Sequence, residues 1–103
     1  RDIDAVFAAN DTMALGAIEA IAAAGKTGSI QVVGFDAIDE AREEIEAGRM
    51  AASIAQHPED MGRLAVECAV KAIKGESVPS YVPVPIELIT RSGSGPTNAP
   101  AKP

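Results

Sequence analysis

Short apolar runs alternate with helical patterns along the chain. Asp4–Asn10, Ile30–Asp36 and Met50–Gln56 are each too short and too apolar for a lone helix, which favours buried strands. Between and after these runs, apolar residues recur at intervals of three and four, which is typical of amphipathic helices. The helical positions are Met13, Ala17, Ile18, Ile21 and Ala24, then Ile38, Ala41 and Ile45, then Met61, Leu64, Ala65, Cys68, Ala69 and Ala72. The pattern predicts an α/β fold with a parallel sheet flanked by helices, connected by right-handed crossovers.

The last part of the chain follows a different pattern. Val82, Val84, Ile86 and Leu88 alternate with Pro83, Pro85 and Glu87. Alternation indicates a strand, but neither proline can donate a ladder hydrogen bond, so this is expected to be an edge strand or a crossing segment. Residues 91–103 are rich in Gly, Pro, Ser and Ala and are expected to form a flexible tail.

Each of the three apolar runs ends in a polar residue, namely Asn10, Asp36 and Gln56. In open α/β sheets the ligand crevice lies outside the carboxyl ends of the strands, so these side chains could share one rim, with Phe35 beside them. A carboxylate accepts hydrogen bonds from hydroxyls, and amides both donate and accept, which suits an array of sugar hydroxyls. Gly34 would let another group approach the strand backbone closely.

Simpler interpretations exist for each of these residues. Asn10 or Asp11 could cap the following helix, Asp36 could hold a local turn, Gln56 could simply end a strand, and the Phe35 ring could belong to the core. Because the three polar residues stand at equivalent strand ends, a shared binding site is favoured over a separate local role for each of them.

Composition excludes several functions. The 103 residues make one domain or part of one, and a formal net charge of −6 argues against a nucleic-acid surface or an anionic membrane partner. The single cysteine, Cys68, excludes an internal disulfide and has no neighbours for a zinc site. No apolar run approaches the ~20 residues of a membrane span. Because a buried-type strand follows almost directly after Arg1, the chain is suspected to be a fragment of a longer one.

No catalytic constellation is present in the sequence. His57 has no Ser or Cys motif near it, Cys68 lies on an apolar helical stripe, and the paired acidic residues Asp39–Glu40 and Glu43–Glu44 fall on a solvated helix face. Phosphate-binding glycine loops and the common hydrolase motifs are missing. The sequence therefore predicts a protein that is not an enzyme, with no catalytic residue, no metal and no cofactor.

Four stretches resemble the C-terminal part of periplasmic sugar-binding proteins of the ribose-binding type. They are VFAANDTMALGAIEAIAAAGK, VVGFDAIDEA, AASIAQHPEDMG and VPVPIELIT, and the resemblance runs from about Asp4 to Thr90. It implies a two-lobed type I periplasmic binding protein fold, of which residues 1–56 supply sheet and helices of the C-terminal lobe. Residues 57–90 would form the crossing helix and returning strand.

The same resemblance implies a function. The full protein would close its lobes on a monosaccharide, a ribose-like pentose or a hexose, with Asn10, Phe35, Asp36 and Gln56 contacting the sugar. It would deliver that sugar to an ABC importer permease, in the periplasm or outside the cell, lipid-anchored if Gram-positive. Sugar-sensing repressors of the lac-repressor class share the fold and rank second, and a flavodoxin-like enzyme is the third class considered.

The third helix raises a question about assembly. Its apolar stripe would pack on the other lobe, and leaving such a stripe in water is unfavourable. It could fold back onto its own sheet, but Pro83 and Pro85 stiffen the return. We therefore expect the isolated chain to form a homodimer through this helix.

Overall fold

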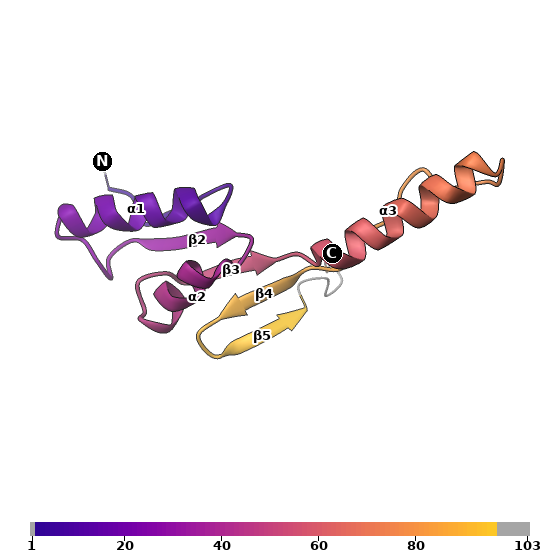
Figure 1. Cartoon of the computed structure of the whole chain (residues 1–103). Coiled ribbons are helices and arrows are strands. Elements are labelled where there is room, and N and C mark those ends of the chain that lie inside the picture. Colours follow the sequence, from indigo (N-terminus) through magenta and orange to yellow (C-terminus); the bar gives the residue numbers. More distant parts are fainter. Residues whose placement is uncertain (1, 97–103) are drawn as a thin grey trace, which may run out of the picture.

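The computed structural model describes residues 2–96 and shows an α/β body with a long helical arm (Figure 1). Its elements, in chain order, are β1 (Ala5–Phe7), α1 (Asp11–Ala23), β2 (Gln31–Phe35), α2 (Asp39–Glu46), β3 (Ala52–Ala55), α3 (Pro58–Ile73), β4 (Glu87–Thr90) and β5 (Gly93–Pro96). The predicted strand–helix alternation is thus confirmed, with strands that are shorter than the predicted apolar runs.

One sheet contains all strands of the described residues, in the order β1-β2-β3-β4-β5. β1, β2 and β3 are parallel, as predicted, and Phe7 pairs with Val33 and Phe35 with Ile54. β4 then pairs antiparallel with β3, and β5 antiparallel with β4. The sheet is therefore mixed, with a parallel half that brings the carboxyl ends of β1, β2 and β3 to one edge.

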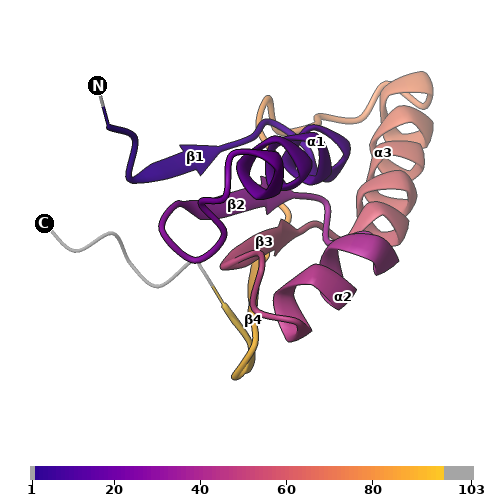
Figure 2. The same ribbon diagram turned by 90° about the vertical axis from the view of Figure 1, so that its left-hand side faces the viewer.

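α1 and α2 cover the same face of this sheet (Figure 2). Both crossovers run in one direction along the strand order, and right-handed connections then place both helices on one side. The core lies between these helices and the strands and includes Ala14, Val32, Ala41, Ile45 and Ile89. No helix in residues 2–96 covers the opposite face, where Phe7 is 63% exposed and Leu88 is also exposed.

Local chemistry sets where the helices begin and end. The side chain of Asn10 caps α1, because its Oδ1 accepts a hydrogen bond from the Met13 amide at 2.9 Å. α2 ends at a turn in which Gly48 adopts φ +84°, a conformation that favours glycine. Arg49 then donates two hydrogen bonds to Glu44, and these lower the pKa of the Glu44 carboxyl.

α3 leaves the body as an arm (Figure 1). Pro58 occupies its first turn, as predicted, and none of its residues is buried. The radius of gyration is 17.6 Å, against about 13 Å for a compact domain of this length. No helix in the described part of the chain is long and apolar enough to cross a membrane. The stripe of α3 is therefore not folded back onto the sheet of its own chain.

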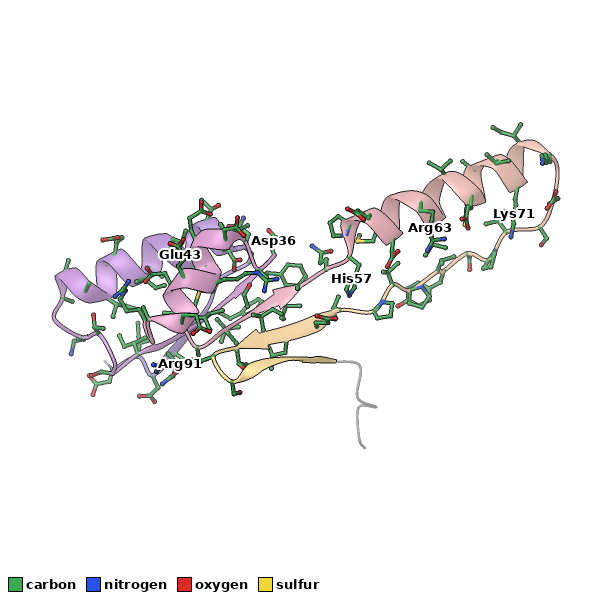
Figure 3. The ribbon with its side chains drawn as sticks, turned by 60° about the horizontal axis from the view of Figure 1, so that its bottom comes forward. Asp36, Glu43, His57, Arg63, Lys71 and Arg91 are labelled. Atoms are coloured by element: carbon green, nitrogen blue, oxygen red, sulfur yellow. The ribbon has the colours of Figure 1, made fainter. Side chains whose placement is uncertain are left out.

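The return from α3 differs from the predicted strand over Val82–Leu88. Residues 76–86 run back alongside α3 (Figure 3), and the strand itself spans only Glu87–Thr90. Pro83 and Pro85 lack the N–H that a ladder needs, so pairing begins only beyond them.

The segment expected to be a flexible tail also differs in part. Gly93–Pro96 forms β5, which pairs with β4 through a tight turn. The Thr90 hydroxyl donates to the Gly93 carbonyl at 3.0 Å, and Gly93 adopts φ +133°. This local turn chemistry brings the chain back against β4 despite its weak strand composition. Residues 97–103, the rest of the expected tail, lie outside the described residues.

Candidate functional site

The candidate site lies at the edge where the parallel strands end. Asp36 directly follows β2 and Gln56 directly follows β3. Their side chains meet, because the Gln56 Nε2 donates a hydrogen bond to the Asp36 Oδ1 at 3.1 Å. Asp36 lies on the body and His57 at the root of the arm (Figure 3). Two of the polar strand ends predicted from the sequence are thus adjacent at one solvent-accessible place.

Asn10 lies at the same edge, two residues beyond Ala8, whose amide donates to the Val33 carbonyl. Its side-chain oxygen serves as the cap of α1, so the simpler interpretation is correct for that atom. Within residues 2–96, Asn10 makes no side-chain hydrogen bond to Asp36 or Gln56. Its amide N–H groups remain the part of Asn10 that could reach a ligand.

Phe35 is the last residue of β2 and is half-buried. It pairs with Ile54, which in turn pairs with Leu88, so the three side chains share the sheet face opposite α1 and α2. The ring therefore lies on the sheet face that α1 and α2 do not cover, next to the carboxyl end of β2. Its role as an apolar surface for a sugar stays a prediction.

Asp36 stands in an unusual backbone conformation. Its φ is +119° and that of Ala37 is +57°, both in the region that disfavours side-chain-bearing residues. Three amide hydrogen bonds hold this turn: Asp36 N–H donates to the Ile54 carbonyl (2.8 Å), Ala37 N–H to the Ser53 Oγ (3.0 Å) and Ile38 N–H to the Asp11 Oδ2 (2.9 Å). The turn that presents the Asp36 carboxylate is therefore fixed by groups beneath it.

Asp11 and Ser53 form the buried base of the site. Both are 0% exposed, and the Ser53 hydroxyl donates to the Asp11 Oδ1 at 2.7 Å. Gly34 is required beside them, since a Cβ at this position would collide with the Asp11 carboxylate and with Met50. The close approach predicted at Gly34 is thus confirmed.

Sequence reasoning missed the part that Asp11 and Ser53 play in the site. The sequence pattern predicts Asp11 only as a possible helix cap and predicts no role for Ser53. The available signal was a serine inside an otherwise apolar run, MAASIA, facing a glycine in the neighbouring strand. A buried hydroxyl there needs a partner, and a nearby carboxylate can supply it.

Two hollows adjoin the site. A shallow cavity of about 330 Å³ lies between Asp36, Gln56, Pro58 and Met61. A second, of about 360 Å³, is an apolar groove between α3 and the returning segment, and its walls include Leu64, Cys68, Val82 and Ile86. The first has polar groups and can hold part of a polyhydroxylated ligand, whereas the second offers mainly hydrocarbon.

The site contains no arrangement suited to catalysis in the described residues. The His57 Nε2 lies 3.7 Å from a Glu87 carboxylate oxygen, and both side chains are accessible to solvent, an arrangement that does not activate a nucleophile. In residues 2–96 no group of three or more His, Cys, Asp or Glu side chains is placed to hold a metal ion.

Comparisons with known proteins agree on a family. The sequence profile of the periplasmic binding protein domain matches residues 1–77. The chain is 46% identical over 89 residues to the ribose import binding protein of Haemophilus influenzae, covering 86% of this chain and 30% of that protein. It is 49% identical over 77 residues to the D-allose-binding periplasmic protein of Escherichia coli, covering 75% and 25%.

Solved structures agree with this similarity. The myo-inositol binding protein of Caulobacter, bound to myo-inositol, superposes with a TM-score of 0.75 at 41% identity, covering 86% of this chain and 30% of that one. A solute-binding protein of an ABC transporter from Agrobacterium vitis, bound to α-D-tagatopyranose, gives 0.80 at 33% identity, covering 88% and 30%. The chain thus spans about 30% of the length of the curated relative of H. influenzae that it matches.

Proposed function

Because this chain belongs to the periplasmic binding protein family, we propose that it supplies the C-terminal part of a monosaccharide-binding subunit of a bacterial ABC importer. The ligand would be a ribose-like pentose or a hexose held between two lobes. The relatives named above are binding proteins for ribose, allose and myo-inositol, which supports a small polyhydroxylated ligand. None of these relatives is a repressor, so nothing in them supports the lac-repressor alternative.

The observation that carries this proposal is the Asp36–Gln56 pair at the carboxyl edge of the parallel strands. In our proposal the Asp36 carboxylate accepts hydrogen bonds from sugar hydroxyls, and the Gln56 amide holds both Asp36 and the sugar at the crossing to the other lobe. The Asn10 amide donates to a hydroxyl and Phe35 lies beside the sugar ring. The full protein binds and releases its ligand without chemistry, then presents both lobes to a permease.

The proposed location follows the proposed function. A binding subunit of an importer works in the periplasm or outside the cell, with a lipid anchor in a Gram-positive source. The name of the allose-binding relative includes the word periplasmic, which supports this location.

Calorimetry on two forms of the protein tests the proposal. The full-length protein is expected to bind at least one pentose, hexose or inositol at micromolar or lower concentration. The 103-residue chain is expected to bind none tightly, because the shallow cavity at Asp36 and Gln56 leaves a sugar largely in water. Tight binding by this chain alone would contradict the two-lobe proposal, and failure of the full-length protein across all three sugar classes would contradict the function.

We also propose that the isolated chain forms a homodimer through α3. The arm exposes Val66, Val70 and Ile73, the last at 85%, and the groove beside Leu64 remains open. A second copy would cover hydrocarbon that its own sheet leaves in water. Sedimentation of the chain at high micromolar concentration is expected to show a dimer, and a monodisperse monomer would contradict it.

Paired variants locate the dimer contact. Leu64→Gln places an amide in the apolar groove and is expected to shift the chain toward monomer. Glu43→Gln is the control, because Glu43 is an exposed residue of α2, on the body and away from α3. Equal effects of the two changes on the sedimentation coefficient would place the interface elsewhere.

A further inference from the structure

The buried carboxylate of Asp11 connects the segment after β1 to the turn after β2 and to Ser53 within β3. Asp11 is the first residue of α1 and directly follows Asn10 at the end of β1. Its Oδ2 accepts from the Ile38 amide just after the β2 turn, and its Oδ1 accepts from the Ser53 hydroxyl on β3. Ser53 in turn accepts from the Ala37 amide. The side chains of Ser53 and Asp11 therefore accept hydrogen bonds from two consecutive amides, those of Ala37 and Ile38, in the turn that carries Asp36.

We propose that Asp11 and Ser53 are positioning residues for ligand recognition, which set the direction of the Asp36 carboxylate without touching the sugar themselves. The inference rests on the proposed function, since it assigns these residues to the same site. It concerns residues that the sequence patterns did not single out for binding.

The backbone at Asp36 explains why such support is needed. Residues other than glycine rarely adopt φ +119°, and a strained conformation of this kind persists only when its surroundings hold it. The Asp36 amide bonds to the Ile54 carbonyl, but that bond fixes only the start of the turn. The Ala37 and Ile38 amides, which define its exit, are held by Ser53 and Asp11 alone among the described residues.

The surroundings of Asp11 make this arrangement specific. Gly34 leaves just enough room for the carboxylate, and Met50 and Ala14 close the space around it. Asp11 also stands at the positive end of α1, which favours a carboxylate there. Asn10 caps the same helix and directly precedes Asp11 in the chain. The buried Asp11 carboxylate therefore links the backbone at Asn10 to the turn that carries Asp36. The spacing of two proposed sugar contacts thus depends on Asp11.

A structural role in general stability is the competing explanation, and it predicts a different result. Losing Ser53 would then loosen the whole body, as any buried deletion does. If Ser53 positions the turn, the loss is concentrated at Ala37 and Ile38. Val32→Ala is a suitable control, because Val32 is buried in β2 and its hydrocarbon side chain cannot hydrogen-bond to these amides.

Hydrogen exchange and calorimetry separate the two explanations. In the full-length protein, Ser53→Ala is expected to speed amide exchange at Ala37 and Ile38 by at least about tenfold relative to Val32→Ala, and to weaken sugar binding by about tenfold or more. Asp11→Asn keeps one oxygen for the Ile38 amide and should give an intermediate effect. It also serves as the test if Ser53→Ala does not fold.

The results also distinguish failure of this inference from failure of the proposed function. Sugar affinity in Ser53→Ala and Asp11→Asn equal to that of Val32→Ala would overturn the positioning role while leaving sugar binding intact. Uniformly faster exchange across the body would overturn it as well. If the unsubstituted full-length protein binds no sugar, the proposed function fails, and the exchange at Ala37 and Ile38 still decides whether Asp11 and Ser53 hold this turn.

Discussion

Replacing Gly34 with alanine is expected to destabilise the fold by about 2–3 kcal/mol, the upper part of the range for overpacking a filled core. The added Cβ would collide with the Asp11 carboxylate and with the Met50 side chain, and would lie 3.1 Å from the Ala14 Cβ. Met50 can move, but Asp11 is fixed by its hydrogen bonds to Ser53 and Ile38. For a chain of this size the change corresponds to a fall in Tm of roughly 10–20 °C.

A second glycine in the same body supplies the control. Gly16 lies within α1, and a Cβ there would meet nothing within 4 Å. Gly16→Ala is therefore expected to stabilise the chain by about 0.5–1 kcal/mol, through the higher helix propensity of alanine. Urea unfolding of the two variants measures both effects. If Gly34→Ala were as harmless as Gly16→Ala, the close packing of Asp11 against β2 would be wrong.

Replacing Asp36 with glycine is expected to separate binding from stability. Glycine adopts φ +119° without strain, so the substitution should raise the free energy of unfolding by about 1 kcal/mol. The same change removes the proposed sugar carboxylate. Hydrogen bonds to a charged group contribute ~1.5–3 kcal/mol each, so sugar affinity of the full-length protein should fall by roughly ten- to a hundredfold or more.

Asp39→Gly provides the matched comparison, because Asp39 is an exposed aspartate three residues away, at the start of α2. There glycine loses helix propensity and the favourable charge at the helix terminus, so stability should fall slightly while sugar affinity is unchanged. Thermal unfolding and calorimetry on both variants are required. A protein with Asp36→Gly that binds sugar normally would contradict the role of this carboxylate.

Elements whose apolar residues recur at a regular spacing were predictable from the sequence. Ile38, Ala41 and Ile45 recur at helical spacing, and α2 buries Ala41 and Ile45 as expected. The parallel pairing of the first three strands followed from their alternation with helices. These features depend on local patterns that each segment carries by itself, so no knowledge of the neighbours was needed.

Features that depend on tertiary partners were not predictable in the same way. β5 has a weak strand composition, and its pairing follows from the turn at Thr90 and Gly93 rather than from its own residues. Asp11 and Asn10 are adjacent acceptors at a helix start, and only the fold decides that Asn10 caps while Asp11 turns inward. Gln56 was predicted at the correct edge, but its hydrogen bond to Asp36 depends on the register of β3 with β2.

The arm begins and ends on neighbouring strands, because Ala55 at the end of β3 pairs directly with Glu87 at the start of β4. Topologically, β3 and β4 are the two legs of a hairpin, and residues 56–86 are a long insertion at its tip. Loop closure entropy grows only with the logarithm of length, so this excursion costs the sheet roughly 2 kcal/mol more than a short turn would. The length and sequence of the arm can therefore change with little effect on the pairing of β3 with β4.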